Sequence, residues 1–193
     1  MAHRDGRRVQ APALISAWIR ALPSVDAVRP PRCPRCEASS RPVGRRLNLV
    51  GHGRRSLVLF GAVELEDEPG FIDLVCRRYR CLVCTAVCLV VPRGVVAGRR
   101  YLMPAIGVAL ALWSLRLLPP DEVRRRLSPF LLTGASATGW ASLRRWARAY
   151  GTGDGTLRER AARFAQALLA TSPLSAQTHA IEPRIYAASL HHS

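Results

Sequence analysis

The chain has 193 residues, of which 49% are hydrophobic, so it can bury a core and is not a wholly disordered sequence. Its 29 basic residues, all arginine, face only 13 acidic ones, which gives a formal net charge of +16 and a pI of about 11.3. A GC-rich genome would explain arginine in place of lysine, but it would not explain the excess of bases over acids. That excess favours a polyanionic partner, of which nucleic acid is the commonest.

The N-terminal region, residues 1–30, begins with a basic, polar run followed by the apolar stretch Ala11–Leu22. Apolar residues recur at helical spacing within this stretch and predict a short amphipathic helix: Leu14, Ile15, Trp18 and Leu22. The stretch contains Arg20 and lacks a convincing cleavage site, so we do not expect a secretory signal. We therefore expect a reducing, cytoplasmic compartment, where clustered cysteines bind metal more often than they form disulfides.

Four of the six cysteines form two Cys-x-x-Cys pairs, Cys33 with Cys36 and Cys81 with Cys84. A two-residue spacing lets both sulfurs of a pair face one metal ion, and two pairs complete the tetrahedral set that zinc prefers. Because four thiolates leave no open coordination position, we predict that these cysteines hold a structural Zn²⁺ ion.

The other two cysteines, Cys76 and Cys88, flank the second pair. We interpret them as small apolar residues that pack between strands. The alternatives are that one of them replaces a ligand or that they contact a second metal ion.

Strand signals surround the cysteine pairs. Arg45–Val50 and Ser56–Glu64 are rich in branched residues and predict two strands separated by a turn at Gly51-His52-Gly53. After an acidic loop, Phe71–Arg80 predicts a strand that enters the second pair, and Val87–Val91 predicts the strand that returns. Strands that lead into and out of a thiolate turn make a zinc ribbon, whose small core requires the metal.

Beyond a linker the chain is predicted to be helical. The expected helices are about Pro104–Leu118, Pro120–Leu127, Trp140–Tyr150 and Thr156–Ala170. The stretch Leu102–Leu118 is apolar, but it is short for a bilayer and contains Arg116, so we expect a buried helix and no membrane partner. Residues 133–139 are rich in Gly, Ser and Thr and are expected to form a turn.

Two helices, a break and a third helix with a basic outer face are the outline of a helix-turn-helix. On the third helix the apolar residues repeat at i, i+3, i+4 and i+7, which leaves the arginines on the other face. An exposed arginine can bind guanine in the major groove or a phosphate, and a merely solvated basic face is the alternative.

The candidate nucleic-acid contacts are Arg77, Arg78, Arg80, Arg124, Arg125, Arg126, Ser142, Arg144, Arg145 and Arg148. Arg99 and Arg100 are also expected to contact phosphates. Trp140 and Trp146 are expected to anchor the core rather than to stack on bases.

We find no convincing catalytic set in the sequence. Metal-dependent phosphoryl transfer needs two or three converging carboxylates, but the acids are sparse beyond Glu122 and clustered in the loop region before it. The chain has no lysine for a glycine-rich phosphate loop, and no Ser-His-Asp grouping can be argued. We therefore predict that this protein is not an enzyme.

The motifs Cys33-Pro-Arg-Cys36 and Arg77-Arg78-Tyr79-Arg80-Cys81-Leu-Val-Cys84 resemble the N-terminal zinc ribbon of bacterial insertion-sequence transposases and related transposase-associated proteins of unknown function. In that family an Arg-Arg-Tyr-x-Cys strand leads into the second cysteine pair, and a helix-turn-helix follows the ribbon. The resemblance covers about residues 30–150. It implies binding of transposon-end or other DNA, a structural zinc ion, and a second copy of the chain or a transposase as protein partner.

The chain departs from the family at two points. Where such ribbons commonly place a glycine after each cysteine pair, this chain has Glu37 and Thr85. The family's catalytic domain, with its three acidic residues, is not expected after Tyr150, so transposase activity is not part of the expectation.

Together these observations predict an α+β protein, in which a small β zinc ribbon is followed by an all-α helix-turn-helix-like domain. The expected parts are a basic arm and short helix (1–30), the ribbon (31–95), the helical domain (99–151), an additional helix (152–172) and a flexible tail (173–193). The expected function is nucleoid-associated binding of double-stranded DNA by a transposase-associated protein or a transposase-derived fragment of a mobile element. A protein-interaction module built on the ribbon, and RNA binding, are the alternatives.

Overall fold

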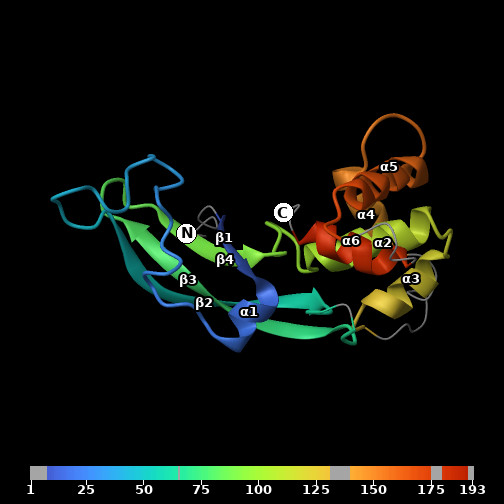
Figure 1. The fold of residues 1–193 in the computed structure, drawn as a ribbon, viewed down its shortest axis with the longest axis horizontal. Coiled ribbons are helices and arrows are strands. Elements are labelled where there is room, and N and C mark those ends of the chain that lie inside the picture. The colour runs from blue at the N-terminus through green and yellow to red at the C-terminus, as the bar shows by residue number, and fades with distance from the viewer. Residues whose placement is uncertain (1–7, 65, 131–139, 175–179, 191–193) are drawn as a thin grey trace. The chain divides into compact units, whose positions relative to one another are not determined.

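The computed structural model describes residues 8–64, 66–130, 140–174 and 180–190. Within these residues the protein is mixed α+β, with a four-stranded sheet and six helices (Figure 1). The chain divides into two compact units. Unit 1 comprises Met1–Val58 and Asp73–Ala97, and unit 2 comprises Leu59–Ile72 and Gly98–Ser193.

The sheet has the strand order β1-β4-β3-β2, and its strands are β1 (Arg8–Leu14), β2 (Leu49–Gly61), β3 (Gly70–Cys81) and β4 (Val87–Arg93). β3 and β4 are antiparallel, with Tyr79 opposite Cys88, whereas β1 runs parallel to β4. The arrows of β2 and β3 point in opposite directions in Figure 1. The end of β2 and the start of β3 belong to unit 2.

Side-chain burial follows the position of each strand in the sheet. On β3, Ile72, Leu74 and Cys76 are buried and alternate with more exposed residues, as expected for a strand with one face in the core. β4 lies between two other strands, and Cys88–Val91 are all buried. A strand that is covered on both faces has a continuous apolar sequence of this kind.

The helix predicted over Ala11–Leu22 is shorter than expected, because Arg8–Leu14 form β1 and only Ile15–Arg20 form helix α1. Hydrogen bonding to β4 competes with helix formation in this stretch, and a single isolated turn of helix is weak. The apolar periodicity correctly predicts two of the buried residues. Ile15 and Trp18 are buried, and the indole Nε1 of Trp18 donates a hydrogen bond to the carbonyl of Val75 at 2.9 Å.

The turn predicted at Gly51-His52-Gly53 is wrong, since one continuous strand, β2, runs through it. Gly53 has a φ of 84°, a conformation that glycine adopts without steric cost. Pairing with β3 therefore accommodates these glycines within the strand, and tertiary context overrides their local preference for a turn.

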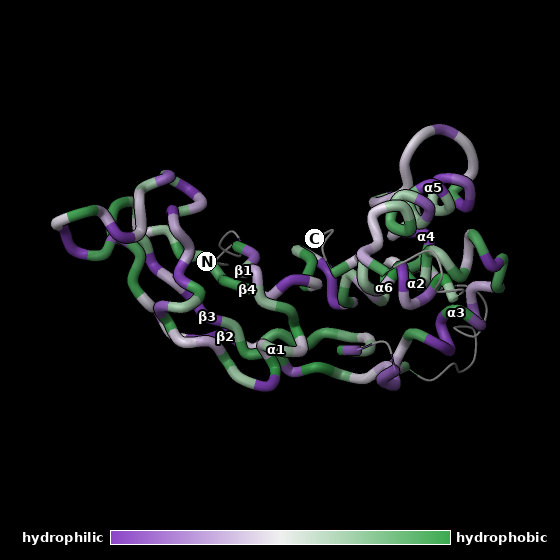
Figure 2. Tube along the Cα trace, viewed as in Figure 1, coloured by the Kyte–Doolittle hydropathy of each residue, from purple (hydrophilic) through white to green (hydrophobic). Residues whose placement is uncertain are grey.

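Unit 2 is built around helix α2 (Met103–Ser114), all of whose residues are buried. Four helices pack against it: α3 (Pro120–Leu127), α4 (Ala141–Tyr150), α5 (Leu157–Ala170) and α6 (Ile181–Ser189). Figure 2 shows α2 as mainly hydrophobic, as a helix covered on all sides must be. The prediction of a buried helix here is confirmed, and no helix within the described ranges is long and apolar enough to cross a membrane.

Helix α6 corrects the prediction that residues 173–193 form a flexible tail. Ile185 and Ser189 are fully buried, and α6 packs on α2 and α5. Ile181, Ile185 and Ala188 fall at helical spacing, but the helix has only 9 residues and contains Pro183, so the helical signal of the sequence is weak. Residues 175–179 and 191–193 lie outside the described part.

Unit 2 is not all-α, because it includes residues 59–72. Phe60 accepts a hydrogen bond from Leu102 N–H at 3.1 Å and donates one to the carbonyl of Arg100 at 2.7 Å. The turn predicted at residues 133–139 lies outside the described part, as do residues 131 and 132, so most of the α3–α4 connection is not described. A helix-turn-helix is therefore still a prediction.

Candidate metal centre and an arginine-lined pocket

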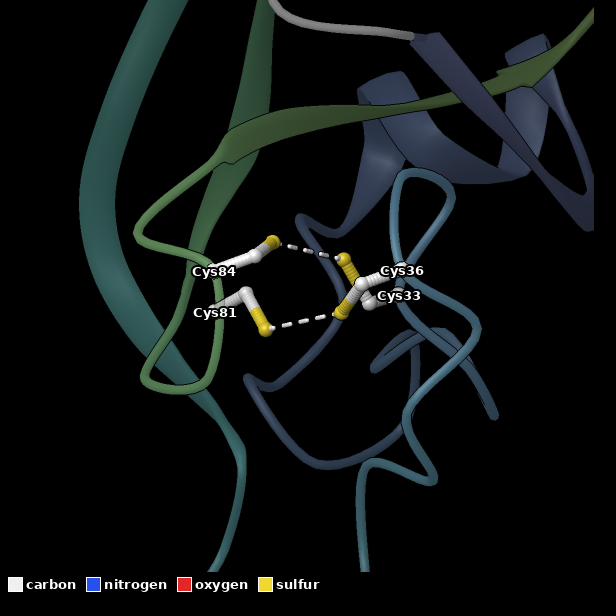
Figure 3. A group of neighbouring side chains, drawn as sticks. All are labelled: Cys33, Cys36, Cys81 and Cys84. Atoms are coloured by element: carbon white, nitrogen blue, oxygen red, sulfur yellow. Dashed lines mark hydrogen bonds between the residues drawn. The ribbon is translucent and has the colours of Figure 1, made fainter.

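The two cysteine pairs adopt the same local structure. In the first, Cys33 N–H donates to the carbonyl of Ala38 at 2.9 Å, and in the second, Cys81 N–H donates to the carbonyl of Ala86 at 2.8 Å. Each bond closes a tight turn that places both sulfurs of the pair on one side. Two distant segments of unit 1 thus form equivalent turns that face each other (Figure 3).

The residue after each pair has left-handed backbone geometry, with a φ of 57° at Glu37 and 60° at Thr85. Non-glycine residues are uncommon in this region, and a β-branched residue such as threonine is disfavoured most. The hydroxyl of Thr85 donates a hydrogen bond to the carbonyl of Cys84 at 2.7 Å. The glycine that the resembling ribbons commonly place here would adopt this conformation without strain.

The four sulfurs of Cys33, Cys36, Cys81 and Cys84 lie within 4.8 Å of one another. Sγ of Cys33 is 3.7 Å from that of Cys84, and Sγ of Cys36 is 3.8 Å from that of Cys81 (Figure 3). A tetrahedron with metal–sulfur distances of about 2.3 Å has edges of about 3.8 Å. The four cysteines can therefore hold a metal ion, as their spacing predicts.

Within this group the pKa of each of Cys33 and Cys36 depends on the neighbouring cysteines. Burial opposes ionisation of Cys33, but hydrogen bonds from the backbone N–H groups of Cys36 and Arg35 and from two thiols outweigh it and lower its pKa to about 7. A backbone hydrogen bond from Ala38 favours the Cys36 thiolate, yet burial and the three other cysteines raise its pKa to about 12. A bound cation would offset the repulsion among four thiolates, so metal binding must release protons.

Cys76 and Cys88 lie outside this group. Both are buried, and burial is the main cause that raises the pKa of Cys76 to about 12 and that of Cys88 to about 11. They are neutral at pH 7 and pack as small apolar side chains, as interpreted from the sequence.

Asn48 connects the segments that carry the two pairs, although no sequence pattern singles it out. Its backbone N–H and side-chain amide donate to the carbonyls of Ser40 and Ser39 at 3.0 and 2.9 Å. Its own carbonyl accepts a hydrogen bond from Leu82 N–H at 2.7 Å. The loop after the first pair is thereby tied to the second pair through one residue.

The predicted nucleic-acid contacts in unit 1 lie on β3 in different surroundings. Arg77 is half-buried, and its Nε donates a hydrogen bond to the carbonyl of Pro23 at 2.9 Å. Arg78 is also half-buried, whereas Arg80 is exposed. Arg77 therefore holds the segment that follows α1.

In unit 2 the predicted contacts on α3 separate into two groups. Arg125 and Arg126 are tied to acids of their own helix: Arg125 lies 3.5 Å from Asp121 and contacts Glu122, and Arg126 donates to Glu122 at 2.8 Å. Arg124, in contrast, lines a pocket.

This pocket has a volume of about 940 Å³, and all its lining residues belong to unit 2. It brings together residues that the sequence analysis selected from three segments: Arg99, Arg100, Arg124, Ser142, Arg144, Arg145 and Arg148. Among the described residues that line it, none is acidic. Six arginines from separate segments therefore line one hollow.

The pocket also has an aromatic wall, which includes residues that sequence reasoning missed. Phe60 and Tyr101 are brought together by pairing of their segments, and their rings are 5.3 Å apart. Tyr101 contacts Trp146 at 5.0 Å, and Trp146 contacts Trp140 at 4.9 Å. Both tryptophans are buried, as expected for core anchors, yet they also line the pocket.

Phe130 is the exposed member of this wall. Its side chain is 42% exposed, and its ring lies 5.0 Å from that of Phe60. The hydroxyl of Tyr101 shares a buried hydrogen bond of 2.8 Å with Ser128 Oγ, which fixes the orientation of the ring. The wall is therefore rigid, while Phe130 offers aromatic surface to a ligand.

Comparisons with protein-family models, with curated proteins and with solved structures find no match for this chain. The resemblance to transposase-associated zinc ribbons therefore stays a prediction from the motifs.

Proposed function

We propose that this protein binds nucleic acid, with DNA as the expected polymer, and that it acts as a binding protein rather than an enzyme. The observation that carries the proposal is the convergence of six arginines on the pocket of unit 2. Three of them, Arg144, Arg145 and Arg148, come from the exposed face of α4. Grouping of arginines on one surface is typical of proteins that bind phosphate backbones.

Internal ion pairing does not account for three of the six arginines. The side chains of Arg99, Arg144 and Arg148 have no hydrogen-bond or ion-pair partner in the described part of the chain. Keeping several like charges close together costs free energy, which an anionic ligand would recover. The alternative, a solvated basic face, does not explain why residues from separate segments line one hollow.

We also propose that the metal is zinc and that its role is structural. Four thiolates match zinc in ligand type and number, and they complete its coordination without a position for substrate. The ion would stabilise the turns of unit 1, as in the zinc ribbon that the motifs resemble. A transposase-associated role for the protein is proposed on that resemblance alone.

The nucleic-acid proposal is tested by fluorescence anisotropy with a labelled duplex of mixed sequence at moderate salt. Wild-type protein is expected to bind, and the triple variant Arg144→Ala/Arg145→Ala/Arg148→Ala is expected to bind at least tenfold more weakly. The variant Arg125→Ala/Arg126→Ala, which loses charge outside the pocket, serves as control. Equal affinity of wild type and triple variant would refute the proposal, and competition with structured RNA distinguishes DNA from RNA as partner.

One observation favours a second function, docking of a protein partner by the cysteine turns. The adjacent apolar residues Leu82 and Val83 of the second turn are 55% and 60% exposed. Exposed apolar side chains at such a tip can anchor a partner. This function predicts a complex that survives nuclease treatment and is lost in the variant Leu82→Ser/Val83→Ser, whose metal content is unchanged.

A further inference from the structure

The pocket of unit 2 combines two chemistries that a phosphate-backbone contact alone does not need. Six arginines and five aromatic residues line it together; the aromatic residues are Phe60, Tyr101, Phe130, Trp140 and Trp146. A phosphate needs only the arginines. An aromatic wall can stack against a flat ring, and in a nucleotide the flat ring is the base, which is joined to the phosphate through the sugar.

The shape of the site is concave. A recognition helix reads duplex DNA by protruding into a major groove about 12 Å wide. Here Arg144, Arg145 and Arg148 instead line a hollow that they share with segments outside α4. A ligand that enters such a hollow must be narrow. A paired base cannot enter it, because stacking and pairing hold that base inside the duplex.

The size and charge of the hollow match a nucleotide. Its volume of about 940 Å³ lies within the range of small-molecule sites, roughly 300–1,000 Å³. Six arginines exceed what a single phosphate requires, so the site suits a nucleotide with several phosphates or one with a flanking phosphodiester.

We infer that this pocket binds an unpaired nucleotide, whose base lies against the aromatic wall at Phe130 and whose phosphates contact the arginines. The inference rests on the proposed nucleic-acid binding and names the part of the polymer that is bound: an unpaired base at a strand end or in a single strand. A free nucleotide has the same chemistry, and the experiment separates the two sources.

The test uses the full-length, metal-loaded protein and a short single-stranded oligonucleotide with a fluorophore at its 3′ end. Competitors are the unlabelled strand with and without a 5′-phosphate, a blunt duplex, ATP and pyrophosphate. Quenching of tryptophan fluorescence gives a second signal, because Trp140 and Trp146 line the pocket.

Phe130→Ala removes the exposed aromatic surface and leaves the charge unchanged. It is expected to weaken single-strand binding about tenfold, since stacking of one base on an aromatic side chain has about that effect. Phe130→Leu retains apolar volume without a π face and should behave similarly if the Ala variant folds poorly. Phe71→Ala is the matched control, because Phe71 is more exposed and contacts Phe130 at 5.3 Å but does not line the pocket.

The inference is supported if the single strand outcompetes the blunt duplex, pyrophosphate competes poorly, and both Phe130 variants lose affinity while Phe71→Ala does not. It is overturned, with the proposed function intact, if duplex and single strand bind equally and the Phe130 variants match wild type. If ATP quenches the tryptophans but no polynucleotide binds, the proposed function fails and a free nucleotide is the ligand. Absence of any binding overturns both.

Discussion

Two non-glycine residues at the cysteine turns have strained backbone conformations. Thr85 and Glu37 occupy equivalent left-handed positions, each immediately after a cysteine pair. A left-handed conformation costs a non-glycine residue roughly 1–2 kcal/mol. The turns are held in place by their backbone hydrogen bonds and, as we propose, by the metal, which together must offset this cost.

Replacing Thr85 by glycine should therefore stabilise the metal-loaded protein. Glycine relieves the backbone strain, but it loses more conformational entropy on folding than threonine does. Because the free energy of strain is the larger of the two, we expect the free energy of unfolding to rise by about 1 kcal/mol or less. Thr85→Ala is the matched control, because it loses the same hydroxyl but keeps a Cβ. Urea denaturation should rank glycine above alanine at this position, and the reverse order would contradict the assignment of strain.

The sequence identified residues best where spacing alone defines the chemistry. The prediction that these four cysteines come together in one group is confirmed, because two Cys-x-x-Cys pairs have few other uses. Asn48 and Phe60 were missed, since their roles depend on which segments the fold brings beside them. The arginines of α4 were found from helical periodicity, but periodicity could not show that they share a pocket with Arg99 and Arg124.

Local hydrogen bonds define where a helix begins, and helix α5 has the best defined N-terminus. Thr156 Oγ1 accepts a hydrogen bond from Glu159 N–H at 3.3 Å, while the Glu159 carboxylate accepts one from Thr156 N–H at 2.7 Å. This reciprocal pair is a capping box. It orders the N-terminus of a helix that packs on α2.

Thr156→Ala should lower the free energy of unfolding by about 1 kcal/mol, because it removes one of the two capping hydrogen bonds. Thr156→Ser retains a hydroxyl and should be close to wild type. Thermal or urea unfolding followed by circular dichroism measures the difference, and equal stability of the alanine and serine variants would contradict a capping role.

The capping box also predicts a pH dependence. The backbone N–H of Thr156, followed by its side chain, lowers the pKa of Glu159 below its usual 4.5. A depressed pKa in the folded state means that the carboxylate contributes fully above pH 4.5 and that its contribution fades as the pH falls through the lower, folded-state value. Glu159→Gln should therefore be less stable than wild type at neutral pH, with the difference shrinking in acid.

Within α2, Gly107 marks where two other helices approach closely. A Cβ at this position would lie 2.2 Å from Ser189 Oγ and 3.2 Å from a methyl group of Ile185. Gly107→Ala would normally stabilise a helix by about 1 kcal/mol. Here overpacking should dominate and destabilise the protein by roughly 1–3 kcal/mol.

A double-mutant cycle separates this clash from other effects. Ser189→Ala removes the clashing oxygen, which is buried without a hydrogen-bond partner in the described part of the chain, so alone it should be nearly neutral. Combined with Gly107→Ala it should restore part of the lost stability. Strictly additive effects would show that α6 does not lie against Gly107.

Helix boundaries were predicted well where prolines, glycines and capping residues mark them. α3 runs from Pro120 to Leu127 as predicted, and α4 ends before Gly151. β1, the long strand β2 and helix α6 were not predicted, because each depends on pairing or packing with distant segments rather than on its own sequence pattern.

At the scale of the whole molecule, unit 1 should depend on the proposed metal ion, because the ion would join two cysteine turns that come from distant segments of the chain. In the metal-loaded protein we expect none of the six thiols to alkylate readily: four bind the ion, while Cys76 and Cys88 are buried. A chelator should release one ion per chain and make all six reactive as unit 1 loses its structure. Mass spectrometry after alkylation measures this, and four reactive thiols in a chelated protein of unchanged circular dichroism would contradict a structural role.

We propose that arginines of the unit 2 pocket bind nucleic-acid phosphates, and this contact should determine how the affinity depends on salt concentration. For a DNA ligand, log K falls with log salt concentration by roughly 0.7–0.9 for each phosphate contact. The triple variant Arg144→Ala/Arg145→Ala/Arg148→Ala should therefore show a slope shallower than wild type by about 2 to 3, with lower affinity at every salt concentration. An unchanged slope in the triple variant would show that these arginines do not contact phosphates.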